Sequence, residues 1–312
     1  MIVYDSKKWN NLASTIFKTF RQAYNVRKLT LFMTVTLIYS VLMTYVNLTF
    51  FTGYFKIDTV FFTIIGVILS LFLVFRINTS YDRWWEGSIT WHKLLSDSRT
   101  LAMSLDGLLP VNDTMRRNFF VKSISNYAIA LQSHLRDEDA LDHLIFVNRA
   151  YTKSLEQTDH LPNTIINLIY SEIHALGHAD IITDRDKTQL KDHLRDMVDL
   201  MTSCERIHRT PIPFSHSTFI KIFALIYIFM LPFGLVNVFG WLTIPAVCVM
   251  AFAMFGVEII SEEIEHPFGT DANDLPTGYM SDMIRENVYE ILKVKLDFKL
   301  EKRPRKEADV LL

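Results

Sequence analysis

The chain has 312 residues, of which 50% are apolar and 21% are charged. This balance excludes a pure bundle of membrane spans and favours a membrane protein with a substantial soluble part. The formal net charge of −2 excludes the strongly basic balance expected of a nucleic-acid-binding protein. The two cysteines, Cys204 and Cys248, lie on opposite sides of a predicted span, so neither a disulfide nor a CxxC metal site is expected.

Residues 1–28 predict a cytoplasmic amphipathic helix, because apolar side chains recur at helical spacing among lysines and arginines. Four later segments are apolar and long enough, at roughly 20 residues, to cross a membrane as helices. They are Leu29–Phe51, Ile57–Phe75, Phe219–Phe239 and Trp241–Val257. Short connections pair them into two transmembrane hairpins, within residues 29–77 and 219–257. Lysines and arginines in the flanks place both termini in the cytoplasm.

The region between the hairpins, residues 78–218, predicts helices throughout and is expected to be cytosolic. No proline occurs between Lys56 and Pro110, so the second span should continue into this region as one long helix. Apolar spacing predicts further helices, from about Thr114 to His134, from Leu161 to Leu176, and from a cap at Thr183. The C-terminal segment 258–312 is expected to be cytoplasmic. With no alternating pattern typical of strands, the sequence predicts an all-α membrane protein.

Two groups of residues could hold a metal ion. His174 and His178 are four apart and share one helical face, but the glutamate of an H-E-x-x-H zinc motif is missing. Asp271 and Asp274 stand in a loop and offer the oxygen ligands that Ca²⁺ prefers. Acidic residues at a turn also commonly cap the next helix. A membrane-bound metal-dependent enzyme or scaffold, one functional hypothesis, would need one of these groups.

An apolar stripe runs along the second half of the second span. It comprises Val67, Leu71 and Phe75, at positions i, i+4 and i+8, and leads into Asn78 and Asp82. Such a stripe usually faces lipid or a neighbouring helix. If several subunits met around an axis, these side chains would form apolar rings that constrict a pore.

An acidic run follows the last span and comprises Glu258, Glu262, Glu263 and Glu265. These carboxylates could attract cations to a pore mouth. A solvated helical face is the favoured interpretation.

Three segments, considered together, resemble motifs of the bestrophin family. The first runs from Arg76 to Glu86, the second reads Cys204-Glu205-Arg206-Ile207-His208-Arg209-Thr210-Pro211-Ile212-Pro213-Phe214, and the third reads Glu265-His266-Pro267-Phe268-Gly269-Thr270-Asp271-Ala272-Asn273-Asp274-Leu275. With this order and spacing, the resemblance covers nearly the whole chain and is greatest to the bacterial branch.

The resemblance implies a homopentameric ion channel with one pore on the five-fold axis. Val67, Leu71 and Phe75 would form a hydrophobic neck, and Ile212 would lie at or near a cytosolic aperture. The motif below the neck, expected to serve packing and subunit contacts, comprises Asn78, Asp82, Arg83, Trp84 and Glu86. Partners would be other copies of the chain, membrane lipids and permeating ions. A bacterial inner membrane is expected, and no cofactor is required.

Ion selectivity is predicted from the neck. Dehydration at an uncharged constriction favours weakly hydrated anions such as chloride, so an anion channel is predicted. Acids at Asp82 and in the 258–265 run leave a Na⁺ or K⁺ channel of the same fold as the alternative. Thr270 and Ala272 interrupt the loop in which animal bestrophins hold Ca²⁺, so Ca²⁺ at Asp271 and Asp274 is an alternative and not a requirement.

Overall fold

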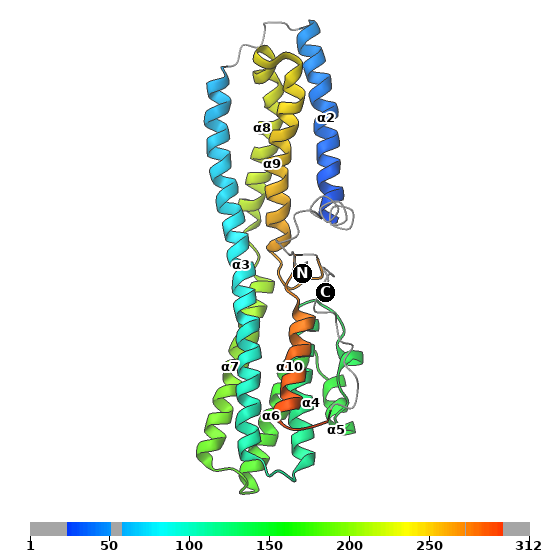
Figure 1. Ribbon diagram of the computed structural model, residues 1–312, viewed down its shortest axis with the longest axis vertical. Coiled ribbons are helices and arrows are strands. Elements are labelled where there is room, and N and C mark those ends of the chain that lie inside the picture. Colours follow the sequence, from blue (N-terminus) through cyan, green and yellow to red (C-terminus); the bar gives the residue numbers. More distant parts are fainter. Residues whose placement is uncertain (1–23, 51–57, 272, 296–312) are drawn as a thin grey trace, which may run out of the picture. The chain divides into compact units, whose positions relative to one another are not determined.

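The computed structural model describes residues 24–50, 58–271 and 273–295, and no β-strand occurs within these ranges (Figure 1). In chain order, its α-helices are α2 (Tyr24–Phe50), α3 (Thr59–Leu108), α4 (Thr114–His134), α5 (Arg149–Glu156), α6 (Leu161–His178), α7 (Asp184–Arg209), α8 (Phe214–Phe239), α9 (Thr243–Ile264) and α10 (Thr277–Ile291). Two short 3-10 helices are η2 (Leu141–His143) and η3 (Gly240–Leu242). The prediction of an all-α chain is confirmed for the described residues.

The helices form two compact units, each assembled from segments that are distant in the sequence. The hairpin unit comprises α2, α3 as far as Trp84, and Pro211–His266 with α8 and α9. The bundle unit comprises α3 from Trp85 onward, α4 to α7, and α10. Helix α3 therefore contributes residues to both units.

Within the described residues, α2 and the first part of α3 lie in the first two predicted spans, and α8, η3 and α9 lie in the other two. Three helical stretches among the described residues are long and apolar enough to cross a membrane: Val26–Phe50, Thr59–Leu108 and Asp184–Ile264. The last contains both α8 and α9. Most of the expected N-terminal helix (residues 1–23), the turn at 52–56 and residues 296–312 lie outside the described residues.

Local sequence accounts for the helix boundaries. The prediction that the second span continues as one long helix is confirmed, since α3 runs for 50 residues and ends just before Pro110. Helix α7 begins with a capping box, in which the side chains of Thr183 and Asp186 each accept the other's backbone N–H. Gly240 turns the chain from α8 toward α9 with a φ of +52°, a conformation that favours glycine.

In the hairpin unit, α2, α8 and α9 pack side by side, and α3 adds one apolar face to their core (Figure 1). Small residues allow close helix approach, as expected where apolar packing drives association in a membrane. The Tyr227 hydroxyl donates to the carbonyl of Phe62 over 3.2 Å. A Cβ at Gly66 would lie 2.7 Å from that hydroxyl, and a Cβ at Gly234 would overlap the Phe62 ring.

The bundle unit is built around α4, which packs against α6 and α10. Tyr127 of α4 is fully buried and donates to the backbone carbonyl of Met197 in α7 over 2.8 Å. Arg117, also buried, donates to the carbonyls of Leu109 and Leu292, so one guanidinium holds the end of α3 and the end of α10 to α4.

Candidate ion pathway and the charged cluster beside it

The predicted apolar stripe lies on the face of α3 that points away from the hairpin-unit core. Val67, Leu71 and Phe75 are 64%, 54% and 53% exposed. At about 100° per residue, these positions fall within an arc of roughly 80° on the helix. Leu69 and Leu73, on the opposite side, are buried in the core. The stripe therefore lies on the surface of the single chain, where lipid or another copy of the chain can cover it.

The polar residues after the stripe continue the same face. Asn78 and Asp82 are both exposed, and the helical repeat places them within the arc occupied by Val67 to Phe75. The hydroxyl of Thr79, a turn below Phe75, donates to the Phe75 carbonyl over 2.9 Å. The face thus changes from apolar to polar at one level of α3.

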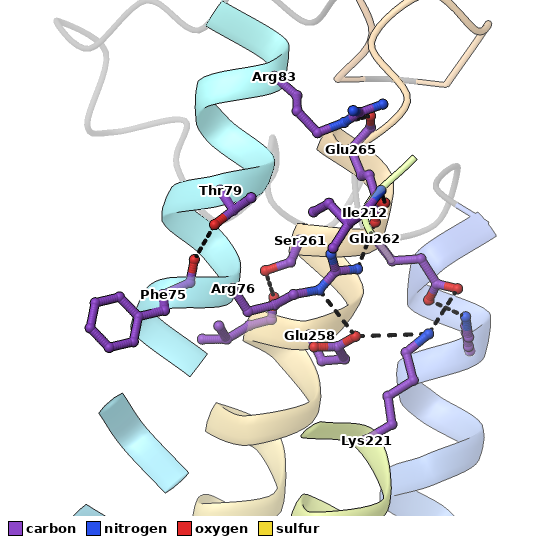
Figure 2. A network of polar contacts seen from close by, with 12 residues as sticks. Phe75, Arg76, Thr79, Arg83, Ile212, Lys221, Glu258, Ser261, Glu262 and Glu265 are labelled. Atoms are coloured by element: carbon purple, nitrogen blue, oxygen red, sulfur yellow. Dashed lines mark hydrogen bonds and ion pairs between the residues drawn. The ribbon is translucent and has the colours of Figure 1, made fainter. Parts of the chain in front are cut away.

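Arg76 anchors the opposite side of α3 in a buried charged cluster (Figure 2). Its Nη2 atom lies 2.7 Å from Glu265 Oε2, and its Nε atom lies 3.6 Å from Glu258 Oε1. The Phe75 ring points away from this cluster, although the two residues are adjacent in sequence. The consecutive side chains Phe75 and Arg76 therefore lie on opposite sides of α3. Phe75 is exposed, and Arg76 holds α3 to α9 and its end.

Two lysines extend this cluster to the remaining helices of the hairpin unit. Lys221 of α8 lies 3.8 Å from Glu258 and 3.3 Å from Glu262, and Lys28 of α2 lies 2.6 Å from Glu262. Three cations, including Arg76, thus meet three carboxylates from α9 and its end. Because α2, α3, α8 and α9 all contribute, the cluster ties the four helices together at one level.

The interpretation of the acidic run as a solvated face is wrong for Glu258 and Glu265, which are 7% and 6% exposed. The reason is Arg76, which supplies the opposite charge that a buried carboxylate requires. Sequence reasoning also missed the pairing of Lys28 and Lys221 with Glu262. The signal was available in part, since Lys221 interrupts an otherwise apolar predicted span, and a charge in such a place needs a partner.

The three segments that carry the family resemblance meet within the hairpin unit. The backbone N–H of Ile212 donates to Glu265 Oε1 over 2.9 Å, and Arg83 Nε donates to the Glu265 carbonyl over 3.1 Å (Figure 2). Glu265 therefore holds the first and second segments through its side chain and backbone. This contact fixes the backbone at Ile212, whose side chain is half-buried.

The same segments also meet within the bundle unit. Glu86 forms an ion pair with Arg206, in which the Arg206 side chain is largely exposed and the Glu86 side chain about half-exposed. A Cβ at Gly87 would lie 3.2 Å from the side chains of Phe268 and Leu275, so the glycine fits closely against the third segment. On the hairpin-unit side of the boundary, Trp84 stacks on Tyr81 with ring centroids 6.1 Å apart. Arg83 and Glu86 thus each contact another of the three segments, and their role below a neck stays a prediction.

The two metal candidates from the sequence differ in geometry. His174 and His178 lie on one face of α6 with ring centroids 6.5 Å apart, and among the described residues they belong to no cluster of three potential metal ligands. Asp274 is buried and its carboxylate accepts the Asp271 backbone N–H over 2.7 Å. That bond fits the turn-capping alternative, and Ca²⁺ binding at this loop stays a prediction.

Comparisons with known proteins identify a family and relatives to which the chain is similar. A family model described as bacterial/fungal bestrophin protein matches residues 1–290. A Nostoc sp. protein named voltage-dependent anion channel-forming protein is 34% identical over 231 residues, covering 72% of this chain and 74% of the relative. A Synechocystis sp. protein with the same descriptive name is 30% identical over 234 residues, covering 73% and 76%.

The fold has solved counterparts. The crystal structure of a bacterial bestrophin homologue from Klebsiella pneumoniae matches with a TM-score of 0.80 and 23% identity, covering 86% of this chain and 99% of that one. At this identity the likeness supports the fold alone. Together with the family match along residues 1–290, the apolar helices and the converging motifs, it leads to one conclusion: the chain belongs to the bestrophin family of membrane proteins.

Proposed function

We propose that this chain forms a homopentameric anion channel in which the outward face of α3 lines the pore. The observation that carries the proposal is the exposed stripe of Val67, Leu71 and Phe75, which leads directly into exposed Asn78 and Asp82. A single copy cannot enclose a pathway with an outward face. Copies arranged around an axis would bring their stripes together as stacked apolar rings.

Such rings form a hydrophobic neck. An uncharged constriction cannot choose an ion by charge, but it imposes a dehydration cost that is smaller for large, weakly hydrated ions. Chloride and similar anions therefore fit better than Na⁺. The neck ends where Asn78 and Asp82 begin, so an ion leaving it would meet polar groups immediately.

The charged cluster supports the anion assignment. Attraction of cations by the acidic run would require unpaired carboxylates on the pathway, whereas Glu258, Glu262 and Glu265 are each paired with Arg76 or a lysine. Asp82 remains exposed and keeps a cation channel of the same fold as the second candidate. The descriptive names of the Nostoc and Synechocystis relatives also favour anions.

Further parts of the proposal concern the surroundings of the pore. Ile212 would form a narrow cytosolic aperture, held in place by its N–H bond to Glu265. The loop at Asp271 and Asp274 would tie neighbouring subunits together without requiring Ca²⁺. The channel would sit in a bacterial inner membrane with both termini in the cytoplasm. Family and relatives favour a channel over an enzyme.

The reversal potential under a KCl gradient tests the ion sign directly. Purified protein would be fused into a planar bilayer, and current would be recorded with unequal KCl on the two sides. We expect a reversal near the Cl⁻ equilibrium potential. A reversal near the K⁺ value would replace the anion assignment with the cation alternative, and the absence of any current would count against conduction.

A further inference from the structure

Three side chains of the bundle unit converge at a point that the ion pathway does not use. His134 is the last residue of α4, His160 is the N-cap of α6, and Glu205 lies one turn before the end of α7. His134 Nε2 lies 3.1 Å from Glu205 Oε1, and His160 Nε2 lies 2.8 Å from the same oxygen. The two imidazole rings are 4.4 Å apart between centroids.

The three ligand atoms have the spacing of a metal site. They all lie within 4.8 Å of one another. In tetrahedral zinc sites, metal–ligand bonds of about 2.0–2.2 Å place neighbouring ligand atoms roughly 3.3–3.5 Å apart. An ion could therefore enter if the two imidazole nitrogens moved away from Glu205 Oε1 by roughly 0.2–0.7 Å. The side chains are 20–28% exposed, so water could complete the coordination.

The donor set defines the class of ion. Two imidazoles and one carboxylate are the protein ligands of many zinc centres that keep an open position. Ca²⁺ and Mg²⁺ prefer oxygen ligands throughout, so they fit this set poorly.

Hydrogen bonding without a metal is the simpler interpretation of the cluster. The two interpretations differ in which ring nitrogen of His160 carries the proton. His160 Nδ1 accepts the backbone N–H of Asn163 over 3.3 Å, which requires the ring proton to sit on Nε2. A metal at Nε2 would move this proton to Nδ1 and break the cap bond. The long N···N distance makes this loss small beside three metal–ligand bonds.

We propose that His134, His160 and Glu205 bind a divalent first-row transition metal ion, with Zn²⁺ as the probe, and that water fills the remaining positions. Such an ion would connect the end of α4, the start of α6 and the end of α7 at one centre. Metal binding can be measured in detergent without a membrane, so the test of this site does not depend on the proposed conduction.

Zn²⁺ binding to the full chain provides the test. Tag-free protein in detergent would be stripped with chelator, dialysed against Zn²⁺ with excess Mg²⁺, and analysed for metal content. We expect one Zn²⁺ per chain, with affinity reduced at least about tenfold in Glu205→Gln and in His160→Asn. Asn is a favoured N-cap, so the second variant removes the metal ligand while keeping a cap on α6.

His174→Ala is the matched control. It removes a histidine of α6 that lies outside the cluster, so it should leave the Zn²⁺ affinity unchanged. Co²⁺ absorption provides a second readout, with d–d bands expected in the native chain and lost in His160→Asn. Equal Zn²⁺ uptake by the native chain and His160→Asn would overturn the proposal, as would uptake that His174→Ala reduces to the same extent as Glu205→Gln.

Discussion

Replacing Arg76 by Met should destabilise the hairpin unit more than any change to an exposed charge. Arg76 is 1% exposed and lies beside Glu258 and Glu265, which are also buried. Removing the guanidinium leaves Glu265 buried without its charged partner, and it leaves Glu258 with only Lys221, 3.8 Å away. Breaking a buried pair in this way costs about 3–5 kcal/mol.

A loss of this size should be visible in thermal unfolding of the purified protein in detergent. It corresponds to a lowering of the Tm on the order of 10 °C. Arg195→Met is the matched control, because Arg195 pairs with Asp192 and Asp196 but is 66% exposed. Exposed pairs contribute about 0–1 kcal/mol, so the control should shift the Tm by only a few degrees.

The triple variant Arg76→Met, Glu258→Gln, Glu265→Gln separates charge from shape. It should recover most of the lost stability, because no buried charge is left without a partner and Gln can still accept the Ile212 N–H through its side-chain oxygen. The reasoning would be refuted if Arg76→Met were no more harmful than Arg195→Met, or if the triple variant unfolded at the temperature of the single one.

Two further substitutions test close packing and capping. Gly234→Ala should cost about 1–3 kcal/mol, because the new Cβ would overlap the Phe62 ring, whereas Gly256→Ala, with open space around it, should be neutral or slightly stabilising. Equal Tm values for the two variants would contradict this. Thr183→Ala should lower stability by about 1 kcal/mol through loss of the α7 cap, with Thr202→Ala on the exposed face as control. No difference between these two would argue against the capping box.

Much of the fold could be predicted because it depends on local signals. The expected helix from Thr114 to His134 matches α4, and Thr183 was identified as the cap of α7. Proline spacing was enough to predict that α3 continues for 50 residues. These features depend on neighbours within a turn or two, which a single sequence displays.

The charged cluster could not be predicted in the same way. Arg76 and Glu265 are 189 positions apart, and only the tertiary fold brings them together. Sequence patterns therefore showed an arginine at the end of a span and an acidic run elsewhere, without the pairing that buries both. His134, His160 and Glu205 were missed for the same reason, since three different helices contribute to them.

Single-channel conductance of neck variants tests the central claim that the α3 stripe lines the ion pathway. Leu71→Ala and Phe75→Ala would be compared with Val249→Ala, a smaller truncation at an exposed apolar position of α9. We predict that the two α3 variants widen the neck and change conductance or ion selectivity, while Val249→Ala behaves as the native channel. Unchanged currents in both α3 variants would contradict the account.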